Sequence, residues 1–498
     1  MPNVSAKIDL TRIMDPASYD AIRETFESQG FIMTITPEDG IKVPKHLDHL
    51  RGHCFKSGVT PDEYATLKQG LAKFCKWFEL ENDPVSPIWS EDEARKPAAG
   101  KRALLADEAF STPDFTHLQN HLENPPLGLG AHTIHATQIP GRLGENVKVF
   151  DIEYGWYDHE DRGLGYHGVI YGSNATYRDH GTAVACEICG NDQNGFGIKG
   201  IAPGVQFYSI SNSAGLARSL IEVLKHVDPE KDRVIVGVEL QYRPFSEFNV
   251  PWQYVPPTQF SSYRDTIRML TDQGIHVMLA ASNGAADLDD PRFNGVFQED
   301  VGAIMVGAGS RGDHAPLSFT GYGSPVHVQG QGHWVTTGGY GGLWNPGDPT
   351  RTYTETFNGT SSSLPKAMAC GAIALALLEA AGKSTLAPRE LRKLLIETGT
   401  PQKPDYRHIG PFPNLIRLKH RLIPGPDYDL DGMVRFNDFI QFASYYQEGN
   451  LGADLNGDGV VDFQDFLVFA QHFNGPAKWV VMQAAKFAIR RIDGQKAV

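Results

Sequence analysis

The sequence has few cysteines and no long apolar run. Its five cysteines, spread over 498 residues, cannot form the disulfide framework of a small secreted domain, so we expect mostly free thiols. No basic segment followed by an apolar stretch is visible near the amino terminus, and no stretch reaches the about 18 apolar residues of a membrane span. We therefore expect no integral membrane segment and recognise no secretory signal.

Positive charge is also scarce. The chain has 45 Lys and Arg against 59 Asp and Glu, a net charge of −14, which argues against nucleic acid or an anionic membrane as the main partner. Residues 425–475 alone hold nine acidic residues and one basic residue, so much of this excess is local. Apolar residues make up 41% of the chain, which excludes a disordered protein.

The first 125 residues mix charge with helical periodicity. Apolar side chains recur at three- and four-residue steps at Tyr64, Leu67, Leu71, Phe74 and Phe78, which predicts an amphipathic helix. The segment ENPPLGLG, residues 123–130, is typical of a linker. We expect residues 1–125 to be a helical accessory or propeptide-like segment.

From residue 130 to 400 the pattern becomes alternating. Short apolar runs predict strands, and amphipathic segments between them predict helices. The strands expected are 147–153, 205–211, 233–240, 275–282 and 303–310. Such alternation predicts an α/β domain with a parallel sheet and helices on both faces, whose active site lies at the carboxyl ends of the strands.

Four polar residues follow these strands or open helices. Singly, Asp151 fits a strand-end cap, His180 a structural histidine, Asn283 a turn residue before glycine and Ser361 a helix cap. Together they supply what acyl transfer needs: a nucleophile, a general base, a carboxylate that orients the base and an amide donor for the oxyanion.

The local motifs resemble those of subtilisin-like serine proteases. FDIEYGW, HGTAVA, AASNG and GTSSSLP are similar to the family's aspartate, histidine, oxyanion and nucleophile motifs, in the order Asp, His, Ser. The resemblance covers residues 130–400 and implies polypeptide substrates, with Asp151 orienting His180, Ser361 attacking and Asn283 stabilising the oxyanion. A catalytically silent fold used as a binding or assembly module is the alternative.

Three features leave alternatives open. The segment VGVELQYRP departs from the family pattern and puts Glu239 near the substrate cleft. The cluster Asp287, Asp289 and Asp290 fits either a pocket for basic side chains or a solvated or calcium-binding loop. Cys186 and Cys189 form a C-x-x-C motif without a second pair, so buried free thiols are expected rather than a zinc site.

The segment 420–476 contains an internal repeat with an offset of 27 residues. Both copies have oxygen-bearing residues at positions 1, 3, 5 and 12 of a 12-residue loop and glycine at position 6, which is the spacing of an EF-hand calcium loop. The expected calcium ligands are Asp427, Asp429, Asp431, Met433 and Asp438 in the first loop, and Asp454, Asn456, Asp458, Val460, Asp462 and Asp465 in the second. Position 9 of the first loop is Arg435, which offers no oxygen, so we expect weaker binding there.

Aspartate at position 12 makes this repeat similar to a dockerin domain, which implies calcium as a structural ion and a cohesin-like partner. Residues 477–498 form a basic tail, with a helix expected at 479–492 that packs on the calcium loops. The loops favour an extracellular location, whereas the lack of a visible signal favours a cytoplasmic one.

Overall fold

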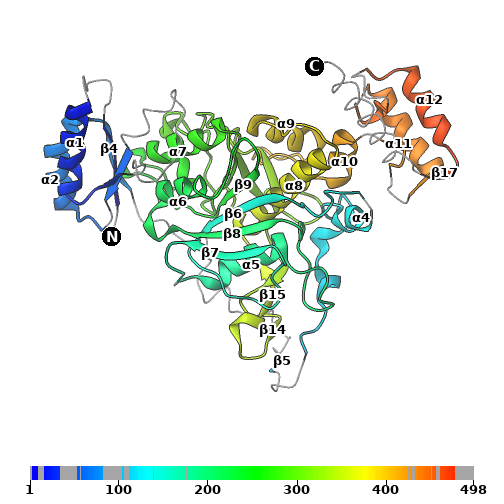
Figure 1. The fold of residues 1–498 in the computed structure, drawn as a ribbon, viewed down its shortest axis with the longest axis horizontal. Coiled ribbons are helices and arrows are strands. Elements are labelled where there is room, and N and C mark those ends of the chain that lie inside the picture. The colour runs from blue at the N-terminus through cyan, green and yellow to red at the C-terminus, as the bar shows by residue number, and fades with distance from the viewer. Residues whose placement is uncertain are drawn as a thin grey trace, which may run out of the picture.

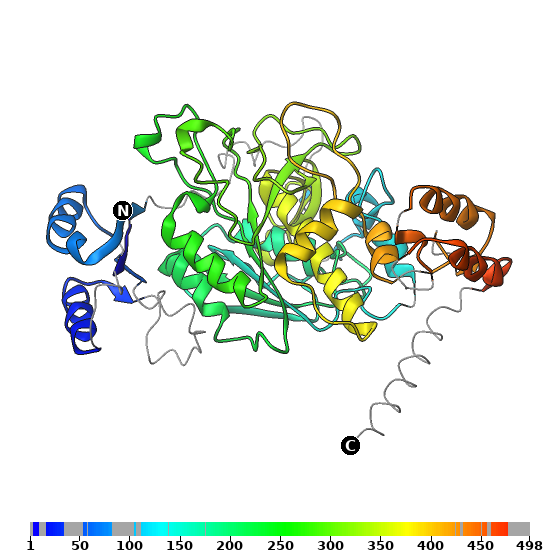
Figure 2. The same cartoon turned by 90° about the horizontal axis from the view of Figure 1, so that it is seen from above.

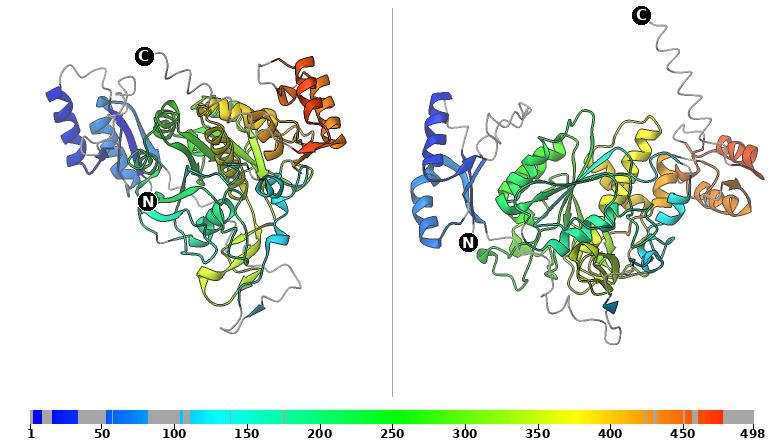
Figure 3. Two further views of the ribbon diagram at one scale, coloured as in Figure 1. Left: turned by 45° about the vertical axis from the view of Figure 1, so that its right-hand side comes forward. Right: turned by 60° about the horizontal axis from the view of Figure 1, so that its bottom comes forward.

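The computed structural model describes residues 3–8, 16–33, 53–56, 58–81, 104–105, 111–137, 139–174, 176–423, 425–428, 432–449, 451–455 and 460–476. A central α/β domain carries a small module at each end (Figure 1). Two further views show the same arrangement, with the amino-terminal module and the carboxyl-terminal helices on opposite sides of the central domain (Figure 3). The expected tail helix, 479–492, lies outside the described residues.

The amino-terminal module is a four-stranded antiparallel sheet rather than a purely helical segment. Its strand order is β2-β3-β1-β4, and its elements are β1 (Asn3–Ile8), α1 (Pro16–Ser28), β2 (Ile32–Met33), β3 (His53–Lys56), α2 (Pro61–Leu71) and β4 (Cys75–Glu81). The expected amphipathic helix is therefore too long: α2 ends at Leu71, and Phe78 belongs to a strand. The apolar side chains still meet, because the rings of Tyr64 and Phe78 pack 5.8 Å apart across the two elements.

The central domain is built on a seven-stranded parallel sheet with the order β12-β11-β10-β9-β6-β8-β7. The strands are β6 (Val147–Glu153), β7 (Tyr166–Tyr171), β8 (Gln206–Ser211), β9 (Arg233–Val238), β10 (His276–Ala280), β11 (Ile304–Gly309) and β12 (Val328–Gln331). All five expected strands are present, which confirms the α/β prediction. The sequence analysis missed β7 and β12, the two edge strands.

Helices cover both faces of this sheet (Figure 2). One apolar core includes α5 (Arg178–Cys189) and α8 (Thr360–Ala380), and the other includes α6 (Leu216–Val223) and α7 (Ser261–Asp272). By length and composition α8 would pass for a membrane span, but the domain buries it completely. Further elements are α4 (Ala131–Ala136), α9 (Pro388–Thr398), α10 (Leu415–Leu422) and a second sheet of β13 (Val335–Gly338), β15 (Tyr353–Phe357), β14 (Trp344–Asn345) and β5 (Leu104–Leu105).

The amino-terminal module contacts the central domain at α7. Lys7 on β1 pairs with Asp265 on α7. The carboxylate of Glu79 on β4 accepts hydrogen bonds from the backbone N–H and the hydroxyl of Ser261, at 3.1 and 2.8 Å. Because Ser261 is the first residue of α7 and the preceding Phe260 provides no side-chain cap, Glu79 serves as the cap of this helix from another module.

The carboxyl-terminal module pairs two short helices, α11 (Phe436–Gln447) and α12 (Phe463–His472). The strands β16 (Met433–Val434) and β17 (Gly475–Pro476) join its two ends. Its core consists of Tyr428, Val434, Phe442, Ala453 and Phe469. The expected boundary at 420 falls inside α10, which packs against α8 and α9 and so belongs to the central domain.

Candidate active site

The expected catalytic side chains gather at one edge of the parallel sheet. Asp151 lies on β6, two residues before its last residue Glu153, and Asn283 follows the end of β10. His180 and Ser361 lie in the first turns of α5 and α8, and both are almost completely buried. The connections that cross the sheet place the first turns of α5 and α8 beside the carboxyl ends of the strands. The active site of a parallel α/β sheet is expected at this edge.

The carboxylate in contact with His180 is that of Glu153. Nδ1 of His180 contacts Oε1 of Glu153, and both side chains are buried. Sequence reasoning gave the orienting role to Asp151, whereas the carboxylate that contacts His180 in the structure is that of Glu153. Residues two apart on a strand point to the same face, so β6 offers two carboxylates towards the histidine and the motif alone cannot choose between them.

Asp151 makes a different contact. Its Oδ2 accepts a hydrogen bond of 2.9 Å from the indole N–H of Trp156. Burial and the negative charge of Glu153 raise the pKa of Asp151 well above its usual range, and the hydrogen bond from Trp156 opposes this shift. Two buried carboxyl groups so close together do not both ionise readily, which favours the neutral form of Asp151.

Asn283 is held in one orientation by the start of α8. Its Oδ1 accepts hydrogen bonds from the backbone N–H of Thr360 at 2.8 Å and from the Thr360 hydroxyl at 3.0 Å. Since a backbone N–H can only donate, the amide oxygen is identified and Nδ2 is the donating end. Nδ2 lies 3.0 Å from the position that a β-carbon on residue 359 would occupy. Glycine at this position therefore lets the amide of Asn283 lie close to the backbone.

Ser361 follows Gly359, whose φ of 95° sets the turn into α8. Oγ of Ser361 has no hydrogen-bond partner within the described part of the chain, and neither has Nε2 of His180. Both atoms are buried.

A buried ion pair lies beneath the site, and sequence reasoning missed it. Lys366 on α8 contacts Glu187 on α5, and both side chains are completely buried. Nζ of Lys366 also donates 2.6 Å to the carbonyl of Ser362, next to the nucleophile. In the sequence, the pair is visible only as the single lysine of the α8 segment and the single glutamate of the α5 segment.

The acidic side chains after Asn283 form local hydrogen bonds and an ion pair. Asp289 accepts hydrogen bonds from the Ser324 backbone and hydroxyl and from Gln298, and Asp290 pairs with Arg292. These contacts favour the structural interpretation over a pocket for basic side chains. The five cysteines are all free, as expected, and burial raises the pKa of Cys186 and Cys189.

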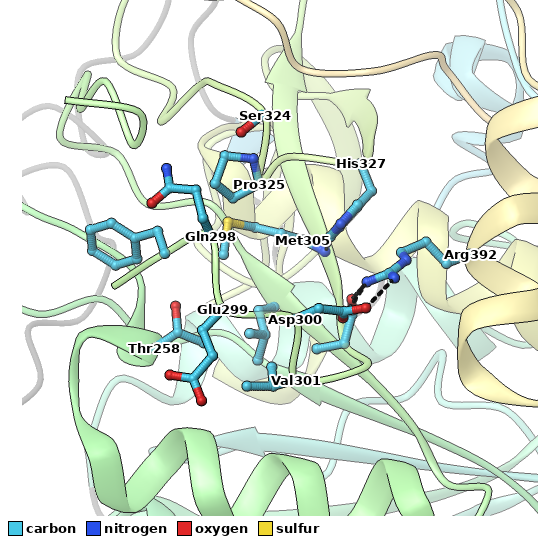
Figure 4. A pocket seen from close by; sticks show the side chains of 13 residues that line it. Thr258, Gln298, Glu299, Asp300, Val301, Met305, Ser324, Pro325, His327 and Arg392 are labelled. Atoms are coloured by element: carbon cyan, nitrogen blue, oxygen red, sulfur yellow. Dashed lines mark hydrogen bonds and ion pairs between the residues drawn. The ribbon is translucent and has the colours of Figure 1, made fainter. Parts of the chain in front are cut away.

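A separate cavity of about 200 Å³ lies where β11 and β12 begin, at the opposite edge from Asn283 (Figure 4). Its two carboxylates are paired: Asp300 with Arg389 and Arg392, and Glu299 with Arg264 and Arg268. Nδ1 of His327 accepts a hydrogen bond from the backbone of Met305, and burial lowers the pKa of this imidazole to about 3. With its charges paired, this cavity offers no set of groups for acyl transfer.

The two copies of the carboxyl-terminal repeat share the same closing contacts. Asp438 accepts backbone N–H bonds from Tyr428 and Arg435 at 2.6 and 2.7 Å. Asp465 accepts the equivalent bonds from Leu455 and Asp462 at 2.7 and 2.9 Å. Four expected ligands, Asp429, Asp431, Asn456 and Asp458, lie outside the described residues, and within the described ones no group of three metal-binding side chains occurs.

The parallel α/β fold, with His180, Asn283 and Ser361 at the carboxyl edge of its sheet, defines the class of α/β serine hydrolases. Residues 145–410, more than half of the chain, match the model of the subtilase family, peptidase S8. The chain belongs to this family, and these residues form a subtilisin-like serine endopeptidase domain.

Known proteins resemble the same region. The chain is 26% identical over 269 residues to the minor extracellular protease Epr of Bacillus subtilis (strain 168), a match covering 52% of this chain and 36% of that protein, so it spans about a third of that relative. Fervidolysin from Fervidobacterium pennivorans, a keratinolytic enzyme related to subtilisin, aligns with a TM-score of 0.52 at 15% identity over 87% of this chain and 61% of its own. A cold-adapted subtilisin-like proteinase gives 0.39 at 19% identity over 54% and 89%.

Proposed function

We propose that the chain hydrolyses internal peptide bonds of polypeptides through an acyl-enzyme on Ser361. The observation that carries this is the pair of reactive atoms, Oγ of Ser361 and Nε2 of His180, which have no hydrogen-bond partner among the described residues and belong to buried side chains at the carboxyl edge of the sheet. His180 takes the serine proton as Oγ attacks the scissile carbonyl carbon, and returns it to the leaving amine. Water then attacks the acyl-enzyme by the same steps and frees Ser361.

The developing negative charge on the carbonyl oxygen needs donors. Nδ2 of Asn283 and the backbone N–H of Ser361, at the amino-terminal end of α8, supply them. Glu153 keeps His180 in the tautomer that leaves Nε2 free to accept the proton, and stabilises the imidazolium that forms.

Labelling with a fluorophosphonate tests this function against the alternative of a silent binding module. Purified protein should become covalently labelled, and Ser361→Ala should abolish the label. A matched Ser363→Ala variant, two residues further along α8, should keep it. Absence of label in folded wild-type protein would favour the silent module.

The amino-terminal module, residues 3–81, is proposed to act as an inhibitory propeptide. Its sheet contacts α7 through Lys7 and Glu79, so it meets the catalytic domain at a defined surface and not only through a linker. Processing of full-length protein should yield a shorter, active enzyme. Active protein that stays full length would contradict this role.

The carboxyl-terminal module is proposed to be a dockerin-like calcium module. Support comes from the equivalent closing bonds of Asp438 and Asp465, which shape two matching loops, and from donor sets made of carboxylate and carbonyl oxygens, the ligands that calcium prefers. Each closing oxygen keeps a second lone pair for a cation. Calcium would stabilise the folded module without a part in catalysis.

Titration calorimetry tests the module: the full chain should take up calcium, and Asp465→Asn should reduce the uptake. A cohesin-like partner and an extracellular location are the further expectations, since loops of this kind need calcium concentrations typical outside the cytosol.

A further inference from the structure

The residues on both sides of Asn283 contact one loop of the catalytic domain. This loop, residues 241–255, follows β9 and is closed at its base by two backbone hydrogen bonds of 3.0 and 2.8 Å. The hydroxyl of Ser282 donates to the carbonyl of Tyr254 at 3.2 Å. A β-carbon on Gly284 would collide with the same carbonyl oxygen, so glycine at this position lets the two backbones touch. The loop therefore packs directly on the segment that carries the oxyanion donor.

Gln241, the first residue of this loop, binds Asn283 itself. Its side chain is buried and belongs to the segment VGVELQYRP, which departs from the family pattern. The backbone N–H of Asn283 donates to Oε1 of Gln241 at 2.8 Å. The side-chain oxygen of Asn283 is held separately by Thr360 at the start of α8. Asn283 is thus fixed at its backbone by the loop and at its amide by α8, and the two contacts together set the direction of Nδ2.

The backbone next to Asn283 has a conformation that needs such support. Ser282 has a φ of 77°, a value that residues other than glycine rarely adopt, and such a backbone persists only where its surroundings hold it. On one side the N–H of Gly321 donates to the Ser282 carbonyl at 3.0 Å, and the N–H of Ala285 donates to the Phe319 carbonyl at 2.7 Å. On the other side Gln241 supplies the acceptor. Removing that acceptor would leave a backbone donor without its partner at the turn that presents the oxyanion donor.

We propose that Gln241 is a positioning residue for the oxyanion donor: its carboxamide holds the backbone of Asn283 so that Nδ2 meets the oxyanion as it forms. The inference rests on the proposed peptidase function, and Gln241 acts through Asn283 rather than on the substrate. Charge on the carbonyl oxygen develops only in the transition state, so a displaced donor lowers the rate more than it weakens substrate binding. A displacement of about 1 Å is enough to cost about 100-fold in rate.

The test measures steady-state hydrolysis of a peptide substrate by the full chain. Gln241→Leu, which removes the acceptor, should lower kcat by about 10- to 100-fold with little change in KM. Added to Asn283→Ala, the same substitution should lower kcat by no more than about twofold, because the donor that it positions is gone. Equal losses in the two backgrounds, or a loss confined to KM, would overturn the proposal. Wild type that neither hydrolyses peptides nor takes a fluorophosphonate label would instead contradict the peptidase function.

A second buried glutamine provides the matched control. Gln259 accepts from the backbone N–H of Phe245 at 3.1 Å and donates to the Arg243 carbonyl at 2.8 Å, so it fastens the same loop at other residues. Gln259→Leu should lower the urea midpoint about as much as Gln241→Leu does, but should leave kcat unchanged. An equal fall of kcat in both variants would overturn the proposal, since loosening of the whole loop would explain it. If Gln241→Leu does not fold, Gln241→Asn, whose shorter side chain withdraws the acceptor, should show the same loss in kcat, and an unchanged kcat there would overturn the proposal.

Discussion

Glu187 and Lys366 form an ion pair that is completely buried between α5 and α8, the helices that carry His180 and Ser361. Burial raises the pKa of Glu187 to about 7, and the lysine opposes this shift. The pair thus links the two catalytic helices at the cost of removing two charges from water.

Breaking this pair should destabilise the protein more than replacing it. Glu187→Gln leaves Lys366 uncompensated and should cost about 3–5 kcal/mol of unfolding free energy, whereas the double variant Glu187→Leu with Lys366→Met should cost clearly less. Urea denaturation in a Ser361→Ala background, which prevents self-cleavage, measures both. Equal losses in the single and double variants would show that the pair contributes through packing alone.

The parallel sheet could be predicted from sequence because its buried central strands are nearly continuous apolar runs, as in β6 and β10. The edge strand β7 is only partly buried and mixes His167 and Gly168 with apolar residues, so its pattern is weak. The amino-terminal sheet was missed because apolar residues of a helix and the following strand together fit one helical period.

The site was predictable only in part. The motifs around His180 and Ser361 carry the chemistry, but Glu153, Glu187 and Glu239 are brought together by tertiary structure. Glu187 and Lys366 stand 179 residues apart, and no local pattern links them. The sequence pattern of β6 placed carboxylates at the end of the strand. It did not show that Glu153, rather than Asp151, contacts His180.

Glu153 should matter more than Asp151 for catalysis. Glu153→Gln removes the carboxylate that orients His180 and should lower kcat by about 10⁴, the loss given for the equivalent asparagine substitution in trypsin-like enzymes. Asp151→Asn, at a side chain that accepts from Trp156, should lose far less. Steady-state hydrolysis of a peptide substrate measures both, and a larger loss in Asp151→Asn would restore the assignment made from the motif.

His327 should make the fold sensitive to acid. Its folded pKa of about 3 lies below the unfolded value near 6.5, so its contribution to stability is complete above pH 6.5 and is lost as pH falls towards 3. This loss amounts to about 1.4 kcal/mol per pH unit within that window. His327→Gln should flatten the pH dependence of the urea midpoint between pH 7 and 4. His117→Gln, at an exposed histidine, is the control, and an equally steep dependence in His327→Gln would contradict the assignment.

The contact between Lys7 and Asp265 should govern release of the amino-terminal module. Lys7→Glu places two acidic side chains together at a largely buried interface, so the module should dissociate more readily and processing should be several-fold faster. The charge-swapped pair Lys7→Glu with Asp265→Lys should restore the wild-type time course. Gel analysis of processing after refolding follows both variants. Failure of the swap to slow processing would indicate that Lys7 acts through folding of its own module.

Lys419 should weaken calcium binding in the first loop. It is completely buried on α10, and burial lowers its pKa to about 7 while Asp427 and Asp438, two expected ligands, oppose that shift. A positive charge beside these carboxylates competes with the calcium ion for them. Lys419→Met removes the charge with little change in volume, so calcium affinity of the first loop should rise by roughly tenfold, the effect of about 1.4 kcal/mol of interaction. Calorimetric titration of the full chain measures this, with Lys393→Met on the exposed face of α9 as the control.

Because the same lysine neutralises Asp427 and Asp438 in the metal-free protein, Lys419→Met should also lower stability when calcium is removed by chelation. Unchanged affinity together with unchanged metal-free stability would show that Lys419 does not act on this loop.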